Sequence, residues 1–192
     1  MDLRSIPTRL LPYNGRLDRR RPGDIRRAVI HATELPDLAT ARIYGERIHY
    51  PASGTGNSGH FYIDRDGRVE QWVALDRVAH HVAGHNADSV GIELVNRGRY
   101  PDWFDSRRQD WLEPNTEAQL VALISLLRAL RDDLPGLATL AGHDQLDLRW
   151  VSASDDPALR VRRKLDPGPG FPWDRISAAT GLMTMERPDG AA

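Results

Sequence analysis

The sequence predicts a single α/β domain in which helices flank a mixed central β-sheet. Short apolar runs of strand length alternate with segments of helical periodicity, which is the order expected for this fold class. The length of 192 residues suits one domain with a substantial core, and neither an internal repeat nor an interdomain linker interrupts it. We therefore expect the domain to span residues 25–182, after an extended Arg-, Pro- and Gly-rich lead-in at 1–24 and before a loose tail at 183–192.

The first half of the chain carries signals for a strand, a helix and a hairpin. Residues 27–31 indicate a short buried strand that ends at a histidine, and residues 37–48 indicate a moderately amphipathic helix. The β-prone residues 60–63 and 69–72 flank an Asp-Gly turn, which is a strong hairpin signal.

The second half supplies the remaining strands and the clearest helix. Residues 90–96 form the most strand-like segment of the chain. Thr116 and Gln119 have the spacing of a capping box, and the apolar residues that follow recur at helical spacing as a core-facing stripe. Residues 137–141 predict another strand, and residues 171–176 begin a short final helix.

Composition excludes several classes of site. The chain has no cysteine, so disulfides, zinc ribbons and thiol nucleophiles are excluded, and any metal must be held by histidine and carboxylate. The net charge of -1 gives no general reason to expect a nucleic-acid partner, and we interpret the arginines of residues 16–27 as a solvated flank rather than a DNA-binding arm. Without an apolar run of signal-peptide or membrane-span length, we expect a cytoplasmic protein.

Histidines end two predicted strands, and a loop supplies a carboxylate that can join them. His31 and His143 lie where α/β folds place ligands. Pro167 favours an extended conformation at Asp166, so that Lys164 and Asp166 share one face. Two histidines from separate elements and one carboxylate are the ligand set of an open catalytic zinc site. The alternatives are two structural histidines and a solvated surface ion pair.

His81 and His85 are a rival pair, because they are four residues apart like paired zinc ligands on a helix. Gly84 interrupts this segment, and no glutamate follows His81 as the helical zinc-protease motif requires. We therefore prefer the set of His31, His143 and Asp166.

Glu93 is the most suggestive carboxylate outside that set. It lies on the opposite face of its strand from Ile92 and Leu94, and Gly91 on its own face leaves room for another group. A charge in so apolar a strand is paired, solvated in a cleft or held near neutral. Glu93 is thus either a salt-bridged or edge-strand residue, or a general base whose raised pKa suits proton transfer near neutral pH.

Six short motifs then occur in the order found in one enzyme family. They are VIHAT at 29–33, SGHF at 58–61, HVAG at 81–84, SVGIELVN at 89–96, GHD at 142–144 and KLDPGP at 164–169. Together they resemble the zinc-dependent N-acetylmuramoyl-L-alanine amidases of the type-2 amidase family, across residues 27–178.

The resemblance implies a mixed sheet with a zinc site at its strand ends. It implies His31, His143 and Asp166 as zinc ligands, and Glu93 and Lys164 as the catalytic pair. Phage enzymes and peptidoglycan recognition proteins usually carry cysteine as the third ligand, so the aspartate indicates the AmpD-like branch. The implied reaction is hydrolysis of the amide between the lactyl group of N-acetylmuramic acid and L-alanine of the stem peptide.

Two features beside this site stay open at the sequence level. His60, His81 and Asn86 either line the substrate groove or have structural roles. Asp166 follows His143 by 23 positions, further than in the compact recycling enzymes, so residues 148–163 should form a long loop beside the metal. The arginines and Trp150 of this loop either contact glycan or the acidic stem peptide, or stay solvated.

Three functions are compatible with these residues. The first is an amidase that acts on soluble anhydro-muropeptides during cell-wall recycling in the cytoplasm. The second is the same chemistry in a lysin or secreted hydrolase that acts on intact peptidoglycan. The third is a non-catalytic peptidoglycan-binding module, which we disfavour because such modules typically lose a metal ligand and all three ligand positions here hold competent residues.

Overall fold

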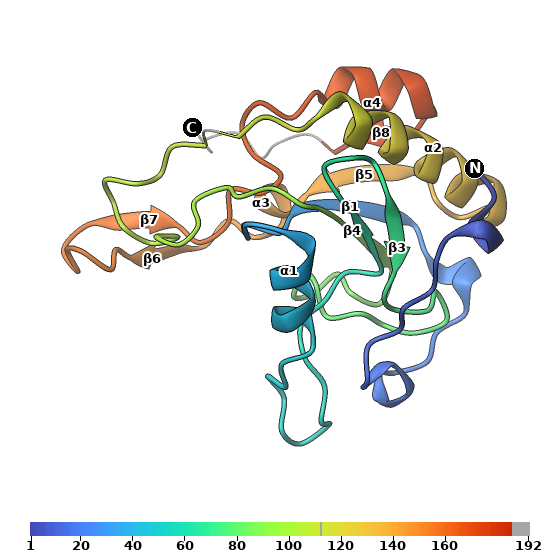
Figure 1. Ribbon diagram of the computed structural model, residues 1–192, viewed down its shortest axis with the longest axis horizontal. Helices are drawn as coiled ribbons and strands as arrows, with labels where there is room; N and C mark the ends of the chain where they lie inside the picture. The colour runs from blue at the N-terminus through green and yellow to red at the C-terminus, as the bar shows by residue number, and fades with distance from the viewer. Residues whose placement is uncertain (112, 186–192) are drawn as a thin grey trace.

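The computed structural model describes residues 1–111 and 113–185 and contains one six-stranded sheet with helices on both faces (Figure 1). The strand order is β3-β2-β4-β1-β5-β8, in which β3 alone runs antiparallel to its neighbour. The prediction of a single α/β domain with a mixed central sheet is therefore confirmed. The strands of this sheet are β1 (Arg27–Ala32), β2 (Phe61–Ile63), β3 (Val69–Gln71), β4 (Ser89–Leu94), β5 (Thr139–Gly142) and β8 (Met183–Thr184).

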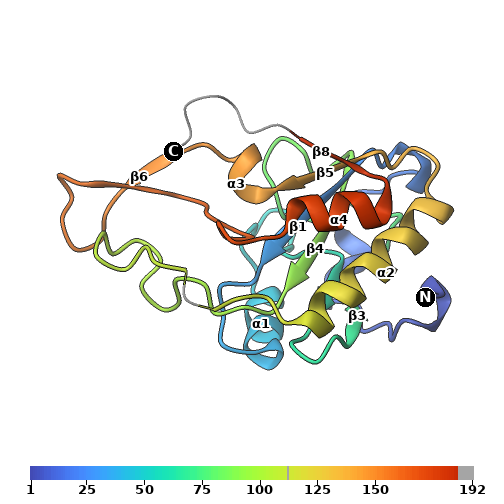
Figure 2. The same ribbon diagram turned by 90° about the horizontal axis from the view of Figure 1, so that it is seen from above.

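The helices divide between the two faces of the sheet. They are α1 (Leu38–Gly45), α2 (Glu117–Asp133), α3 (His143–Leu146) and α4 (Trp173–Thr180). Helices α2 and α4 cover one face and α1 lies on the other (Figures 1 and 2). The predicted capping box is present at the start of α2, where Thr116 and Gln119 exchange hydrogen bonds. None of the helices in the described ranges is long and apolar enough to cross a membrane.

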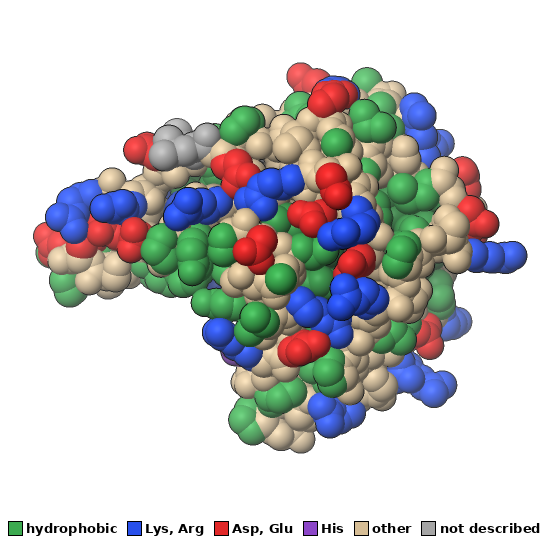
Figure 3. Space-filling model, viewed as in Figure 1, with side chains coloured by type: hydrophobic (Ala, Val, Ile, Leu, Met, Phe, Trp, Pro, Cys, Tyr) green, Lys and Arg blue, Asp and Glu red, His purple; other side chains and the backbone are tan. Residues whose placement is uncertain are grey.

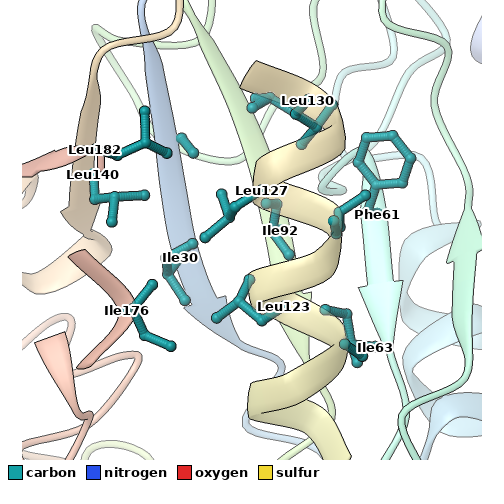
Figure 4. Packing of buried hydrophobic residues seen from close by; sticks show 14 of the residues in the cluster. Ile30, Phe61, Ile63, Ile92, Leu123, Leu127, Leu130, Leu140, Ile176 and Leu182 are labelled. Atoms are coloured by element: carbon teal, nitrogen blue, oxygen red, sulfur yellow. The ribbon is translucent and has the colours of Figure 1, made fainter. Parts of the chain in front are cut away.

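Strand alternation places the main hydrophobic core and the polar side chains of β1 and β4 on opposite faces of the sheet. Ile30 and Ile92 project onto Leu123 and Leu127 of α2, within a cluster of fully buried side chains (Figure 4). Their neighbours in β1 and β4 project from the opposite face, because successive strand residues point to opposite sides. That second face therefore receives the polar residues of these two central strands.

The N-terminal segment packs against the domain more closely than an extended lead-in implies. It contains three short 3-10 helices at Leu3–Ser5, Asn14–Arg16 and Pro22–Asp24. Apolar side chains spaced along its arginine-rich sequence are buried in the two cores, and these are Ile6, Leu11, Tyr13 and Leu17. Their burial removes apolar surface from water, which ties the segment to both faces of the sheet.

The predicted loop at 148–163 is instead a two-stranded antiparallel ribbon. Strand β6 (Trp150–Ser152) pairs with β7 (Arg160–Arg162), and the ribbon protrudes from the domain beside residues 100–111 (Figures 1 and 2). Ser106 donates from its backbone N–H and its hydroxyl to Asp155, which joins the two protruding segments. On the face seen in Figure 3, basic and acidic side chains are interspersed along these two protruding segments.

The C-terminal segment begins inside the sheet. Met183–Thr184 form β8, which pairs in parallel with β5 at the sheet edge. The predicted tail at 183–192 therefore starts with a paired strand, because Leu182 is buried beside it in the core and holds the segment there. Residues 186–192 of that predicted tail lie outside the described residues.

Candidate metal centre and cleft

One cleft brings together all five residues predicted for metal binding and catalysis. His31, Glu93, His143, Lys164 and Asp166 line a cleft of about 370 Å³. His31 lies near the carboxyl end of β1 and is paired in register with Glu93 of β4, and His143 directly follows β5. Ligands commonly bind at the carboxyl ends of parallel strands, which is where this cleft opens.

His31, His143 and Asp166 converge on one another. Their facing atoms all lie within 4.8 Å of each other, and all three residues are buried. The carboxylate oxygen Oδ2 of Asp166 lies 3.0 Å from Nδ1 of His31 and 3.2 Å from Nδ1 of His143. This group can hold a metal ion.

Backbone contacts explain how a distant loop delivers Asp166 to this point. The backbone N–H of Asp144 donates to the carbonyl oxygen of Asp166 across 3.0 Å. Pro167 packs against Gly142, where an added Cβ would approach the proline Cδ to 2.9 Å. A side chain at position 142 would therefore push the aspartate-bearing loop away from His143.

The donor atoms fit a divalent cation. Nδ1 of His143 and Oδ1 of Asp166 are buried and make no hydrogen bond within the described part of the chain. Buried polar atoms without partners cost free energy, and a bound cation would satisfy both. Two imidazoles and one carboxylate suit zinc and leave a coordination position open.

Burial and neighbouring charges shift the pKa values of Asp166 and His143 toward the forms that bind metal. Burial alone would raise the pKa of Asp166, but the neighbouring His143 and Lys164 outweigh it and hold that pKa well below its usual range. Burial lowers the pKa of His143 below its ordinary value although Asp166 opposes this shift, which favours the neutral imidazole. An ionised carboxylate and a neutral imidazole are the metal-binding forms.

Glu93 reaches the cleft as a partly buried carboxylate. Burial raises its pKa above the ordinary value of 4.5. No cation lies within ion-pair distance of it among the described residues, so the alternative of a salt-bridged glutamate is not what the structure shows. Gly59 packs on its stem, since a Cβ at position 59 would lie 2.8 Å from Cγ of Glu93.

Lys164 lies on the same face as Asp166, as its extended segment predicts. Its Nζ is 3.9 Å from Oδ1 of Asp166, and its side chain is 28% exposed toward the cleft. Arg149 and Arg163 line the cleft beside it, and both donate to the carboxylate of Asp147. Both belong to the predicted loop at 148–163, whose arginines the sequence leaves between a substrate contact and a solvated position. The sequence does not indicate that the two arginines share Asp147, because this contact depends on how the β6–β7 ribbon folds back toward α3.

The three residues predicted for the substrate groove separate in the structure. His81 and Asn86 line the cleft, but His60 is fully buried and is not part of its lining. Nδ1 of His60 accepts from the backbone N–H of Gly91, and its Nε2 lies 3.1 Å from the carbonyl oxygen of Arg77. The position of His60 therefore corresponds to the structural alternative, because the strand pairing around it closes off solvent.

His81 and Asn86 have internal partners although they line the cleft. Nδ1 of His81 lies 3.0 Å from His31, and Nε2 lies 3.2 Å from the hydroxyl of Ser89. The side-chain oxygen of Asn86 accepts from the backbone N–H groups of His81 and Val82. Burial lowers the pKa of His81 well below its ordinary value, so this imidazole is neutral.

His81 and His85 do not form a metal pair in this fold. Gly84 has a φ of +85°, so residues 81–85 are not helical. Nδ1 of His85 lies 2.9 Å from a guanidinium nitrogen of Arg27, where a cation would be repelled. The structure therefore does not favour the rival pair, and His31, His143 and Asp166 remain the candidate metal site.

Comparison with known proteins points to one family. Residues 21–169 match the family model described as N-acetylmuramoyl-L-alanine amidase. An endolysin of Klebsiella phage KP32 is 41% identical over 86 residues, which cover 44% of this chain and 52% of that protein. The 1,6-anhydro-N-acetylmuramyl-L-alanine amidase AmpD of Escherichia coli K12 is 32% identical over 136 residues, which cover 66% of this chain and 60% of that protein.

A solved structure shares the fold at low sequence identity. It is the N-acetylmuramyl-L-alanine amidase AmiD from E. coli in complex with anhydro-N-acetylmuramic acid-L-Ala-D-γ-Glu-L-Lys. It superposes with a TM-score of 0.61 at 23% identity, over 83% of this chain and 58% of that one. The chain thus spans about half to two thirds of the length of these relatives.

Proposed function

Because the chain belongs to the N-acetylmuramoyl-L-alanine amidase family, in its AmpD-like branch, we propose that it hydrolyses the amide between the lactyl group of N-acetylmuramic acid and L-alanine. The observation that supports this most is the convergence of His31, His143 and Asp166 in one cleft with Glu93 and Lys164. We propose zinc as the metal, because two imidazoles and a carboxylate suit it and leave one position open.

Glu93 is the proposed proton carrier. Zinc supplies, when bound, Lewis-acid polarisation of the carbonyl and an acidified water. The Glu93 carboxylate takes a proton from the attacking water and delivers it to the leaving nitrogen of L-alanine. Its raised pKa favours both steps, because a general base works best when its pKa is close to the working pH.

Lys164 is the proposed stabiliser of the developing oxyanion. Its ammonium group sits beside Asp166 on the cleft wall, next to the three residues that would hold the metal, so it would face the oxygen of a carbonyl bound there. A fixed cation in a partly desolvated cleft lowers the energy of a negatively charged transition state more than that of a neutral amide.

The cleft wall also has the charge expected for an acidic stem peptide. Arg149 and Arg163 share one carboxylate, that of Asp147, so the three groups together keep one positive charge beside Lys164. A γ-linked glutamate, as in the peptide bound by AmiD, keeps a free α-carboxylate close to the scissile bond. We propose that this carboxylate binds at the arginine pair.

The test is mass spectrometry of the products from a defined anhydro-muropeptide, with and without a chelator. We expect free anhydro-N-acetylmuramic acid and an intact stem peptide from the zinc-loaded protein, and no products after chelation. Intact substrate with zinc-replete protein would reject the proposed hydrolysis in favour of binding alone.

A second candidate is a lysin that cuts intact peptidoglycan, favoured by the 41% identity to a phage endolysin. The two functions differ in substrate size rather than in chemistry. We expect turnover of soluble anhydro-muropeptides to exceed release from intact sacculi, as proposed for a recycling enzyme of the cytoplasm. Faster release from sacculi would support the lysin instead.

A further inference from the structure

A chain of hydrogen bonds runs from the candidate metal ligand His31 through His81 to Ser89. The proposed reaction uses neither His81 nor Ser89. Nδ1 of His31 faces Asp166, and its Nε2 lies 3.0 Å from Nδ1 of His81. Nε2 of His81 lies 3.2 Å from the hydroxyl oxygen of Ser89. That hydroxyl donates to the backbone carbonyl of His85 across 2.5 Å.

Each bond in this chain fixes the direction of the next. The carbonyl of His85 can only accept, so the single hydroxyl proton of Ser89 is used there. Ser89 must then accept the proton on Nε2 of His81, which leaves Nδ1 of the neutral His81 ring as an acceptor. His31 therefore donates from Nε2, and its Nδ1 keeps a lone pair that points toward Asp166 and the metal position.

Strand β4 builds this arrangement with alternate residues of one face. Ser89 ends the hydrogen-bond chain, Gly91 makes room for the His81 ring, and Glu93 reaches the cleft two residues further on. A Cβ at position 91 would lie 2.6 Å from Cγ of His81. The space beside Glu93 that Gly91 leaves open is thus occupied by the His81 imidazole.

The backbone around His81 is fixed as well. The side-chain oxygen of Asn86 accepts from the N–H groups of His81 and Val82 at 3.0 and 2.7 Å. The rings of His31 and His81 meet edge to face, at an interplanar angle of 89° and a centroid distance of 5.2 Å. Both ring nitrogens of His81 are used inside the protein, which leaves neither of them for substrate.

We propose that His81 is a positioning residue that holds His31 in its metal-binding tautomer and orientation, with Ser89 as its anchor. This inference rests on the proposed metal-dependent function. A second ring N–H that is bonded in this way fixes the orientation of a ligand imidazole, and loss of such a partner typically lowers metal affinity by about 10- to 100-fold.

The test compares His81→Ala with His81→Asn in the full chain. The asparagine side-chain oxygen occupies nearly the place of Nδ1 and can still accept from His31, whereas alanine cannot. His85→Ala is the matched control. It removes a neighbouring imidazole that contacts Arg27 and lies outside the hydrogen-bond chain, and it keeps the backbone carbonyl to which Ser89 donates. Zinc affinity is measured by chelator competition, and the absorption spectrum of the Co²⁺-loaded protein reports the ligand geometry.

We expect His81→Ala to bind zinc about 10- to 100-fold more weakly and to shift the Co²⁺ spectrum, with His81→Asn within a few-fold of the wild type. Thermal unfolding of the zinc-free variants checks that each protein is folded. Wild-type affinity and spectrum in His81→Ala would overturn the proposal, as would equal losses in both substitutions. Wild-type protein that binds zinc but cleaves no muropeptide would reject the proposed function and leave this inference standing.

Discussion

Glu93→Gln separates proton transfer from metal binding and from stability. The substitution keeps the volume of the side chain but removes the group that accepts and returns the proton. General acid–base catalysis typically contributes 10²- to 10⁴-fold, so we expect kcat to fall by that factor, which corresponds to about 3 to 5 kcal/mol in the activation barrier. Zinc content should stay at the wild-type level, because Glu93 is not among the three converging ligands.

The stability of this variant should not fall. Glu93 makes no ion pair within the described residues, and burial raises the pKa of its carboxyl, so the ionised form is disfavoured in the folded protein. A neutral amide removes that cost. The assays are turnover of a defined anhydro-muropeptide, zinc content and thermal unfolding, with the exposed Glu117→Gln as control. Near wild-type turnover would refute the role of Glu93 as base, and loss of zinc would show that it acts as a ligand instead.

The remaining predictions concern the metal, the cleft wall and acid stability. Asp166→Ala should reduce zinc content far below the wild-type level, measured by elemental analysis; unchanged content would contradict its role as a ligand. Chelation should destabilise the wild type by about 4 kcal/mol when free zinc had been 1,000-fold above its Kd, seen as a lower Tm, and should leave Asp166→Ala unchanged. Arg163→Gln should raise KM for muropeptide up to about fivefold and retain kcat, as expected when a partly exposed ion pair of ~1 kcal/mol with the substrate is lost. The exposed Arg21→Gln is its control. An unchanged KM would argue against the arginine subsite. Asp147→Asn should be less stable than the wild type at pH 7, with the difference shrinking as pH falls below the ordinary carboxyl value of 3.8. The sign follows because burial would raise the pKa of Asp147 but Arg149 and Arg163 hold it well below its usual range; a difference that is constant with pH in denaturant titrations would contradict this ion cluster.

Local signals in the sequence account for most of the fold. The capping box of Thr116 and Gln119, the Asp-Gly turn and the apolar run at 90–96 are each decided within a few residues, and each element forms where expected. The β6–β7 ribbon was not predictable in the same way. Its turn forms hydrogen bonds with Phe104 and Ser106, which are distant in the chain and are not indicated by any local pattern.

The candidate site shows the same division between local and distant effects. The shared face of Lys164 and Asp166 follows from an extended segment, and the open face at Gly91 follows from strand alternation. Which group fills that face depends on the loop that carries His81, and the sequence leaves His81 between a groove role and a structural role. The burial of His60 likewise depends on the pairing of β2 with β4, which no local pattern determines.

The most direct measurement of the central claim is the site of oxygen incorporation during turnover in heavy-oxygen water. Hydrolysis of the lactyl amide places one labelled oxygen in the carboxyl group of the anhydro-N-acetylmuramic acid product and none in the stem peptide. We predict this pattern for the zinc-loaded protein, together with its loss on chelation and in Glu93→Gln. Label in the peptide carboxyls, or cleavage that persists without metal, would contradict the account.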